Sequence, residues 1–455
     1  MAASLSSSSF IHPQLRHIVS KMTLFDTLLF FVIHFVDKLG FWHRLPVLLG
    51  LAYLGIRRHL HQRYNLLHVG GINGQKYETE EFSYRTADGK CNHPGDDIIG
   101  SQGTFFGRNM PPANSRYGLL DPHPTVVANK LLARNKFIDN GKQFNMIACS
   151  WIQFMIHDWI DHMEDTQQHL NKIADGCPLK SFKFYKTKRV STGSAYMKTG
   201  SLNTRTPWWD GSVIYGNNED GMRKVRTFKD GRLRIAEDGL LEHDENGIPI
   251  SGDIRNFWAG FSLLKALFVK EIMLSVTCLK QENYPGFDDE KLYRHARLVT
   301  SAVLAKIHTI DWTDLFGHIG GPVLSGLVGL RRPRDHGVPY SLTEEFVSVY
   351  RMHSLLPEKL ILRGIHSTAS EYECLQVPMG EMAGKDGEMR LSEVGMEQML
   401  VSMGHQACGA LKLWNYPSWM RNLVPHDING EERPDQFIEI GREESLVTMN
   451  SEGTY

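Results

Sequence analysis

One stretch of the sequence, SWIQFMIHDWIDH at residues 150–162, combines an apolar helical pattern with polar residues at helical spacing. Residues four apart share a face of a helix, so Gln153 and His157 are expected to point in the same direction. Asp158 is turned by about 100° from His157 and is expected to face a different neighbour. A histidine on an apolar face is more often a core residue than a functional one, so the helix alone does not decide its role.

A second group of polar residues lies in the turn TPWWDGS. Thr206, Asp210 and Ser212 supply oxygen atoms at alternate positions of this turn. Together with a backbone carbonyl, such oxygens can surround a hard cation such as Ca²⁺. The alternative is an ordinary turn rich in side-chain hydrogen bonds. A carboxylate that arrives from the separate helix, Asp158, favours the cation.

A third group lies in VSVYRMHSLLPEKL, residues 347–360. Tyr350 and His353 are three apart, so they are expected to share a helical face, and Pro357 marks the end of the segment. Two histidines on separate helices, one near a glutamine and one near a tyrosine, suit a metal or a haem held between them. In such a site the tyrosine can lose an electron and become a radical.

Several helices are needed to position these residues, and the hydrophobic spacing predicts them along most of the chain. Residues 70–125 are rich in Gly, Pro, Asn and Asp and are expected to be mostly irregular. A short hairpin is expected around residues 229–250. The predicted class is mostly α with minor β, with helices at 126–163, 256–280, 288–308, 343–351 and 391–414 and two amphipathic helices within 22–65.

The composition excludes some classes of function. The 455 residues include 50 Lys and Arg and 51 Asp and Glu, so no large field of one sign attracts nucleic acid. The six cysteines are far apart in the sequence and include no C-x-x-C pair. This spacing is typical of reduced thiols in an intracellular protein, and it makes a zinc site built on cysteine improbable.

The N-terminal region contains two apolar runs, Leu28–Val36 and Leu45–Ile56, and both are shorter than the ~20 residues that cross a bilayer. No transmembrane helix is therefore expected. The two amphipathic helices within residues 22–65 either pack on the body of the protein or lie on a lipid surface, and the sequence leaves both open. The expected location is cytoplasmic or peripheral to a membrane or lipid body.

Together these pieces resemble the plant fatty-acid α-dioxygenases of the cyclooxygenase–peroxidase haem superfamily. The resemblance runs from Leu24 to Asp435 and is carried, in order, by HLHQRYNLLHVGGINGQKY, NTRTPWWDGSVIYGNNE, RHARLVTSAVLAKIHTIDWT, HGVPYSLTEEFVSVYRMHSLLP and LVSMGHQACGAL. It implies a mostly α fold like that of the animal haem peroxidases. One such domain would occupy residues 22–435, after a disordered N-terminus at 1–21.

The resemblance also implies a role for each polar group. His157 corresponds to the distal haem histidine of the family, and Gln153 corresponds to its polar neighbour. His353 corresponds to the axial ligand of the iron and Tyr350 to the tyrosine that forms the catalytic radical. His308, in AKIHTIDW, corresponds to a residue that holds the substrate carboxylate.

The cofactors implied are haem b and Ca²⁺. Ile156 and Trp258 stand where mammalian haem peroxidases carry the Asp and Glu that esterify the haem, so the haem is expected to be non-covalent. Arg255 stands where related peroxidases place a distal arginine, and its role here is undefined. The calcium ligands implied are Asp158, Thr206, Trp208 through its carbonyl, Asp210 and Ser212.

The activity implied is α-dioxygenation in a monomer. A peroxide activates the haem, the Tyr350 radical removes hydrogen from the α-carbon of a long-chain fatty acid, and O₂ adds to give a 2-hydroperoxy acid. Two alternatives stay open. One is a haem peroxidase that oxidises small reductants without positioning a fatty acid, and the other is a remnant that no longer binds haem.

The sequence departs from the family most at its end. Similarity stops at Asp435, residues 436–455 form a divergent tail, and the family continues there with a further helical segment that carries a carboxylate-binding arginine. The expectation from this comparison is a C-terminally truncated domain that oxygenates fatty acids poorly, because the loss of a charge-assisted pair costs ~1.5–3 kcal/mol.

Overall fold

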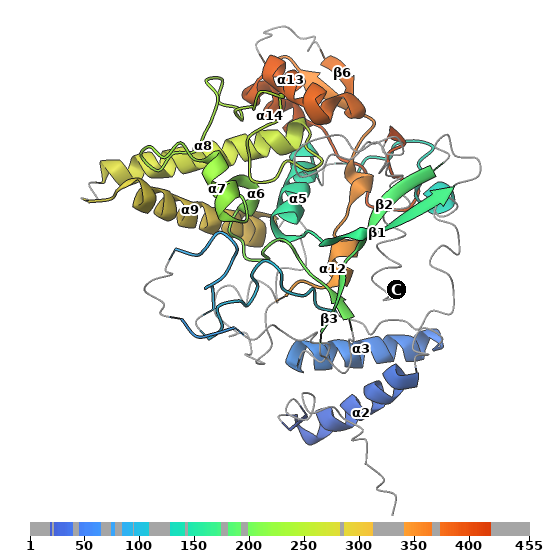
Figure 1. The fold of residues 1–455 in the computed structure, drawn as a ribbon. Coiled ribbons are helices and arrows are strands. Elements are labelled where there is room, and N and C mark those ends of the chain that lie inside the picture. The colour runs from blue at the N-terminus through green and yellow to red at the C-terminus, as the bar shows by residue number, and fades with distance from the viewer. Residues whose placement is uncertain are drawn as a thin grey trace, which may run out of the picture.

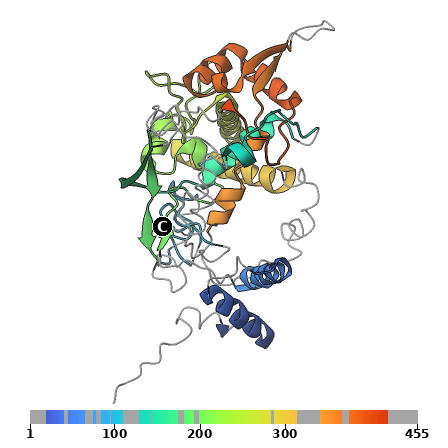
Figure 2. The ribbon, with the colours of Figure 1, turned by 90° about the vertical axis from the view of Figure 1, so that its right-hand side faces the viewer.

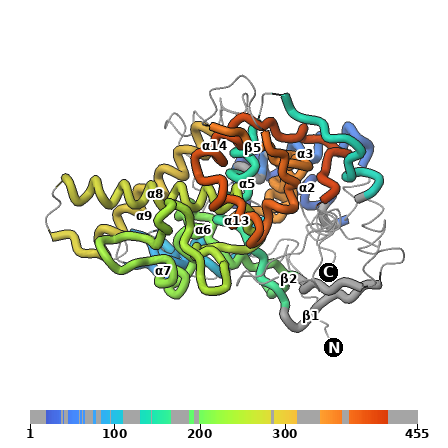
Figure 3. Tube along the Cα trace, turned by 90° about the horizontal axis from the view of Figure 1, so that it is seen from above, coloured from blue at the N-terminus to red at the C-terminus, as the bar shows by residue number. Residues whose placement is uncertain are grey.

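About half of the described residues of the computed structural model are helical, and several of the helices pack around one buried central helix (Figure 1). The central helix α5 (Met146–Trp159) packs against α8 (Ala259–Gln281) and α14 (Met396–His405). Helix α9 (Asp289–Lys306) runs beside α8, and the pair projects to one side of the molecule (Figure 3). The structure describes residues 19–20, 22–39, 45–64, 74–77, 84–93, 95–108, 128–141, 144–173, 181–192, 199–282, 286–312, 341–365 and 374–419.

The predicted class, mostly α with minor β, is confirmed by this arrangement. Residues 1–18 and 436–455 lie outside the described residues. The disordered N-terminus and the divergent tail therefore stay predictions, as do the domain limits.

Helix α5 forms because apolar residues recur along it at helical spacing and because its first turn is capped. Asn145 precedes the helix, and its side-chain oxygen accepts a hydrogen bond from a backbone N–H of the first turn at 3.4 Å. Trp151, Phe154 and Met155 share one stripe and are buried. Phe154 packs on Phe268 of α8 with ring centroids 5.2 Å apart. The whole helix is thereby fixed within the core.

The prediction of one helix over residues 126–163 is wrong for its first part. Ala128–Leu132 form a short π-helical turn, and the described residues between it and α5 are not helical. Their backbone instead pairs with the segment that follows α14, for example at the bridge between Asp139 and Gly409. Pairing with a distant segment outweighs local helix propensity here.

The helices predicted at 256–280 and 288–308 are confirmed as α8 and α9. Asp288 caps α9, because its side chain accepts a hydrogen bond from Lys291 N at 2.8 Å. Beyond α9 the chain continues as a π-helical turn, Ile307–Trp312, which carries His308. Widened turns of this kind are frequent at functional sites.

The single helix predicted at 391–414 is wrong, because two helices occupy this region. Helix α13 (Gly384–Val394) ends at Gly395, and α14 begins directly after it. Gly395 has φ of +80°, a left-handed conformation that glycine tolerates and that interrupts a right-handed helix. Helix α14 ends at His405, so the residues up to 414 are not part of it.

Tyr350 and His353 do not share one helical face, which corrects the prediction. Helix α12 (Glu344–Val349) is capped by Thr343, and Tyr350 already lies at its C-terminal cap. Met352 has φ −106° and ψ 51°, outside the helical region, and His353 opens a separate 3-10 turn. The spacing of three residues was therefore a misleading guide to side-chain direction in this segment.

Short antiparallel strand pairs lie around the helices and confirm the predicted minor β content, although the sequence did not predict their positions. The hairpin predicted around 229–250 forms only single bridges, Arg226 with Leu233 and His243 with Pro249. The pairs are β1 (Glu164–Ile173) with β2 (Ser181–Thr187), β3 (Arg189–Ser191) with β4 (Thr199–Ser201), and β5 (Lys359–Arg363) with β6 (Cys374–Pro378). Two short helices, α6 (Ser212–Tyr215) and α7 (Glu219–Val225), follow the predicted calcium loop.

The two predicted N-terminal helices are confirmed as α2 (Leu24–Leu39) and α3 (Val47–Tyr64), which lie together at one end of the molecule (Figure 2). Asp26 is buried between them, where it accepts hydrogen bonds from Tyr64 Oη at 2.6 Å and from His59 Nε2 at 2.8 Å. Their packing forms a small core of its own. Within the described residues, no helix is both long and apolar enough to cross a bilayer.

Candidate active site

His157 and the carboxylate of Asp253 form the polar centre of the candidate site. His157 lies in the last turn of α5, and its side chain is 13% exposed. Its Nδ1 atom lies 3.3 Å from Oδ2 of Asp253, and its ring packs against Phe261 with centroids 4.9 Å apart. Burial lowers the pKa of His157, and the negative charge of Asp253 only partly offsets this. The imidazole is therefore neutral near pH 7.

Two guanidinium groups balance the charge of Asp253. Arg205 donates to Oδ2 at 2.6 Å, and Arg255 donates to Oδ2 at 2.6 Å and to Oδ1 at 3.1 Å. Burial raises the pKa of Asp253, but these two cations outweigh burial and hold the pKa well below its ordinary range. Arg255 also forms an ion pair with Asp161. Arg255, whose role was undefined in the sequence, is thus a partner of the carboxylate that faces His157.

Gln153 lies one turn before His157 on α5, as predicted. Its Oε1 atom accepts a hydrogen bond from Trp258 Nε1 at 2.6 Å, and its Nε2 atom donates to the carbonyl of Asn256 at 3.0 Å. Segment 253–258 therefore holds both polar residues of this helix face. The amide is fixed in orientation, because its oxygen and its nitrogen have different partners.

Tyr350 and His308 lie together within a group of aromatic rings. Their ring centroids are 6.4 Å apart. Trp159 contacts both, at 5.0 Å from His308 and 6.5 Å from Tyr350. Trp209 lies 4.9 Å from His308, and Phe346 stacks on Tyr350 at 4.9 Å. The fold thus brings together two residues that the sequence assigned to the same substrate.

The aromatic surroundings keep both groups uncharged. Burial lowers the pKa of His308 to about 4, so its ring is neutral near pH 7. Trp151 Nε1 donates to Nδ1 of this ring at 3.2 Å, so the ring proton lies on Nε2. Burial raises the pKa of Tyr350 to about 12, with Trp312 opposing the rise, so the buried phenol keeps its proton.

His353 sits in a segment whose backbone is held from several sides. Arg134, which is buried, donates to the carbonyl of Leu356 at 2.8 Å and also binds the carbonyl of Asn415. A Cβ atom at Gly409 would lie 2.0 Å from the carbonyl oxygen of Ser354, so only glycine allows this close approach. The predicted iron ligand is therefore carried by a fixed turn.

The predicted calcium ligands also lie together. Ser212 Oγ donates to Oδ1 of Asp158 at 3.1 Å. Thr206 Oγ1 donates to Oδ2 of Asp210 at 2.9 Å and lies 3.4 Å from the carbonyl oxygen of Trp208. As predicted, Asp158 faces a different neighbour from the adjacent His157. The carboxylate from α5 meets the oxygen atoms of the turn.

The electrostatics of this oxygen cluster suit a cation. Asp158 and Asp210 are both 0% exposed, and one oxygen of each, Oδ2 and Oδ1 respectively, has no hydrogen-bond partner among the described residues. Burial raises the pKa of Asp158 to about 8, and the charge of Asp210 adds to this. Arg297, at 3.8 Å from Asp210, is a distant partner. In the described part of the chain, no three His, Cys, Asp or Glu side chains form a metal site, so hydroxyl and carbonyl oxygens would have to complete this one.

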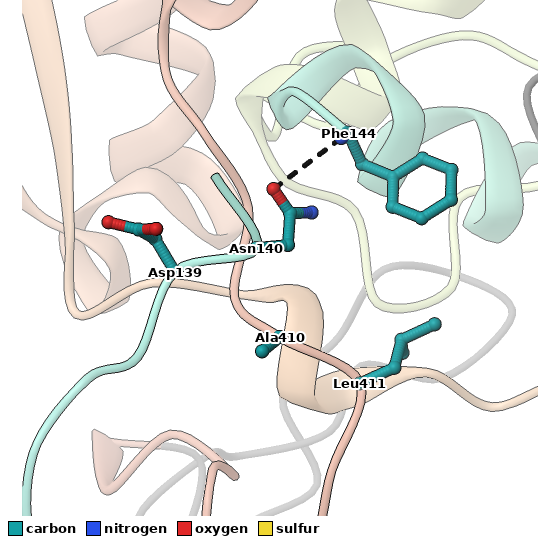
Figure 4. A pocket seen from close by; sticks show the side chains of 5 residues that line it. All are labelled: Asp139, Asn140, Phe144, Ala410 and Leu411. Atoms are coloured by element: carbon teal, nitrogen blue, oxygen red, sulfur yellow. Dashed lines mark hydrogen bonds between the residues drawn. The ribbon is translucent and has the colours of Figure 1, made fainter. Parts of the chain in front are cut away.

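A cavity of about 370 Å³ lies at the entry to α5 (Figure 4). Asp139, Asn140 and Phe144 line it on one side, and Ala410 and Leu411 line it on the other. None of the predicted site residues is part of its wall. The ring of Phe144 also lies 6.0 Å from that of Trp312, which in turn lies 6.2 Å from the ring of His308.

Comparisons with known proteins identify the family of the chain. The family model described as animal haem peroxidase matches residues 84–437. The chain belongs to this family. Haem is the cofactor that membership implies, and the chain is an oxidoreductase of the animal haem peroxidase family.

Within the animal haem peroxidase family, the chain belongs to the α-dioxygenases. Alpha-dioxygenase 2 of Arabidopsis thaliana is 64% identical over 95% of this chain and 74% of the relative. Alpha-dioxygenase PIOX of Nicotiana tabacum is 55% identical over 97% of this chain and 75% of the relative. A crystal structure of Oryza sativa fatty acid alpha-dioxygenase, a Tyr-to-Phe variant with palmitic acid, has a TM-score of 0.79 at 51% identity and covers 95% of this chain and 77% of that chain.

Sequence reasoning missed several residues of the candidate site. Asp253 and Arg205 were not singled out, although they set the surroundings of His157. Arg134 was missed too, although it holds the turn of His353. No local pattern marks these residues, because each meets its partner only through the fold. The density of tryptophan around His308 was the one available signal, since WW at 208–209 and the W at 151 and 159 are visible in the sequence.

Arg134→Met is expected to lower the free energy of unfolding by about 2–4 kcal/mol, because it leaves buried carbonyl groups without their charged donor. Chemical denaturation followed by tryptophan fluorescence measures this loss. Lys359→Met removes an exposed cation from the same region and serves as the matched control. Equal denaturation midpoints for the two variants would show that Arg134 does not hold the turn.

Proposed function

We propose that this chain is a fatty acid α-dioxygenase, which adds O₂ to the α-carbon of a long-chain fatty acid and yields a 2-hydroperoxy acid. The observation that carries the proposal is the contact between Tyr350 and His308, whose ring centroids are 6.4 Å apart. It pairs an oxidisable phenol with a donor suited to a carboxylate. The name and bound palmitic acid of the rice structure support the same substrate class.

The residues fit a haem of the kind that the family implies. His353 would ligate the iron through a neutral ring nitrogen, and its fixed turn suits an axial ligand. His157, also neutral, would face the peroxide with Gln153 beside it. Ile156 and Trp258 offer no carboxylate for an ester bond, which favours non-covalent haem b. When bound, haem together with a peroxide supplies the oxidising power of the reaction.

Tyr350 would act on the substrate itself. After losing one electron and its proton, the phenoxyl group removes a hydrogen atom from the α-carbon of the fatty acid. O₂ adds to the carbon radical, and the phenol returns its hydrogen atom to the peroxyl group, so the fatty acid gains one O₂ and Tyr350 is again a radical. The rings of Phe346 and Trp159 shield this radical from water.

His308 would hold the fatty acid by its carboxylate. The neutral ring carries its proton on Nε2, which can donate a hydrogen bond to a carboxylate oxygen. The donor lies beside the Tyr350 ring, and the α-carbon is the first carbon after the carboxylate. Anchoring the carboxylate at His308 therefore presents the α-carbon, ahead of any other carbon of the chain, to Tyr350.

His157 would move the proton of the peroxide. Its ring is neutral near pH 7, so it can accept a proton at Nε2 while Nδ1 faces Asp253. Gln153 cannot titrate, and its amide is fixed by Trp258 and Asn256. It would therefore orient the peroxide by hydrogen bonding.

Tyr350→Phe is expected to abolish formation of 2-hydroperoxy palmitic acid and to leave peroxide consumption and the haem absorption band near the original level, because the phenol takes no part in peroxide cleavage. Product is measured by chromatography, and Tyr84→Phe removes a phenol elsewhere as the control. His353→Ala should instead lose the haem band. Loss of both activities in Tyr350→Phe would point to a structural tyrosine, and peroxide consumption without any product in the unmodified chain would favour a simple peroxidase.

We also propose that the oxygen cluster binds Ca²⁺ through Asp158, Thr206, the Trp208 carbonyl, Asp210 and Ser212. Two buried carboxylates with unpartnered oxygens repel each other, and a dication offsets both charges. Oxygen-only ligands favour a hard cation over a transition metal. Because Asp158 follows His157 directly, the cation would also fix the last turn of α5.

Removal of calcium with a chelator is expected to lower the melting temperature, since a ligand at 100 times its Kd stabilises the folded state by about 2.7 kcal/mol. Asp210→Asn should show the lower temperature with or without calcium. Asp238→Asn, at an exposed carboxylate, is the control and should respond to calcium like the original chain. If neither calcium removal nor Asp210→Asn changes the melting temperature, the proposed calcium site is contradicted.

Third, we propose that the helix pair α2 and α3 binds a lipid surface. Leu24, Leu28, Phe31, Phe35 and Leu39 recur at helical spacing on α2 and are all at least 38% exposed. The opposite face of α2, with Asp26, already packs on α3, so the exposed stripe is not needed for that contact. An apolar stripe on a surface helix fits a helix that lies in a lipid interface, where long-chain fatty acids reside.

Leu28→Ser combined with Phe35→Ser is expected to weaken binding to phosphatidylcholine vesicles at least ~10-fold, because each buried apolar side chain contributes about 1.5–3 kcal/mol. Vesicle flotation measures the bound fraction. Leu411→Ser combined with Leu413→Ser removes exposed leucines far along the chain and is the matched control. If neither pair changes flotation, or the original chain does not float, α2 is not a lipid anchor.

A further inference from the structure

His157 and Asp158 are neighbours on α5 and point in different directions, yet both are held by the same pair of residues. Val213 N donates to Oδ1 of Asp158 at 3.2 Å. Asp253 N donates to the carbonyl of Val213 at 3.0 Å. Oδ2 of Asp253 then lies 3.3 Å from Nδ1 of His157. These four residues close a ring of contacts that includes the helix backbone.

The carboxylate of Asp253 cannot turn freely within this ring. It is 3% exposed, and Oδ1 accepts from the backbone N of Arg255 at 2.9 Å and from its Nε at 3.1 Å. Oδ2 accepts from Arg205 and from the other end of the Arg255 guanidinium, each at 2.6 Å. The backbone is fixed as well, because the buried Lys265 donates to the carbonyl of Asp253 at 3.0 Å. Oδ2 is thus a fixed anionic oxygen that lies 3.3 Å from Nδ1 of His157.

A neutral imidazole carries its proton on one nitrogen and a lone pair on the other, and its partner decides which. An anionic oxygen at Nδ1 favours the tautomer with the proton on Nδ1, so that Nε2 is left as the proton acceptor. It also favours the ring orientation that turns Nε2 away from Asp253. If Asp253 served only to balance the charges of Arg205 and Arg255, its carboxylate would not need to lie beside the His157 ring.

We propose that Asp253 is a positioning residue for His157, which selects the tautomer and the ring orientation in which Nε2 accepts the proton of the peroxide. The proposal rests on the proposed function, since it assumes that His157 moves that proton. Removal of an outer partner that orients a functional histidine typically costs ~10–100-fold in activity. Loss of the Asp253 carboxylate should lower activity by a similar factor, and only through its effect on His157.

The test uses the haem-loaded chain and two rates per bound haem. One is peroxide consumption. The other is the association of hydrogen cyanide, which must give up its proton to bind the iron and is followed by the shift of the Soret band. Asp253→Asn should lower both rates ~10–100-fold. Glu388→Gln is the matched control, because Glu388 is also a buried carboxylate but binds Ser262 and His243 instead; it should leave both rates near the original level.

A double-mutant cycle separates positioning from structure. In a His157→Gln background, adding Asp253→Asn should change neither rate further, because the two residues act as one unit. If Asp253→Asn lowers the rates by the same factor in that background, or lowers only stability and haem content, the proposal is wrong. If His157→Gln itself leaves both rates intact, the role of His157 in the proposed function fails and the Asp253 proposal fails with it.

A variant that keeps the charge of the cluster guards against misfolding. Asp253→Asn removes the carboxylate that binds both Arg205 and Arg255, which is costly in a buried site. Asp253→Asn combined with Arg255→Gln removes one cation together with the anion, and it is compared with Arg255→Gln alone. The further loss on adding Asp253→Asn should again be ~10–100-fold in both rates. Equal rates for the two variants would overturn the proposal.

Discussion

Negative charge buried beside α5 is the constraint on which the rest of the site depends. Asp158, Asp210 and Asp253 are each at most 3% exposed, and an unpaired charge in such a position costs several kcal/mol. Partners must therefore come from distant segments. Arg205 and Arg255 pair with Asp253, whereas Asp158 is bound by hydrogen bonds from Ser212 Oγ and Val213 N. These contacts hold segments 205–213 and 253–258 against the helix and so define the surroundings of His157.

The other half of the site is built on the opposite principle. Around His308 and Tyr350 the neighbours are mainly aromatic rings, and the pKa values respond to burial: about 4 for His308 and about 12 for Tyr350. Both groups therefore stay neutral at the same pH at which Asp253 is ionised. Helix α5 joins the two halves, since Trp151 and Trp159 contact His308 from the same helix that carries His157. One rigid element thus separates proton transfer from the radical chemistry proposed for Tyr350.

The sequence was a good guide where periodicity decides the structure. The spacing of Gln153 and His157, the different direction of Asp158 and the helices α8 and α9 all followed from the repeat of a helix. It failed where a distant segment overrides local preference, as at 128–141, or where backbone conformation changes within a few residues, as between Tyr350 and His353. Asp253, Arg205 and Arg134 were out of reach for the same reason. Their partners lie far away in the sequence, and the local sequence around a charged residue does not show whether the fold will bury it.

The three histidines with proposed roles show how far environment, more than residue type, sets the state of a side chain. His157 stays neutral because it is buried, although the carboxylate of Asp253 lies 3.3 Å from its Nδ1 atom. His308 faces tryptophan rings and an indole donor, so its single proton is directed outward as a hydrogen-bond donor. His353 owes its position to a turn whose carbonyls bind a buried arginine. In the roles proposed above, the same side chain would serve as proton acceptor, as hydrogen-bond donor to a carboxylate and as metal ligand in one molecule, because the fold gives each ring different surroundings.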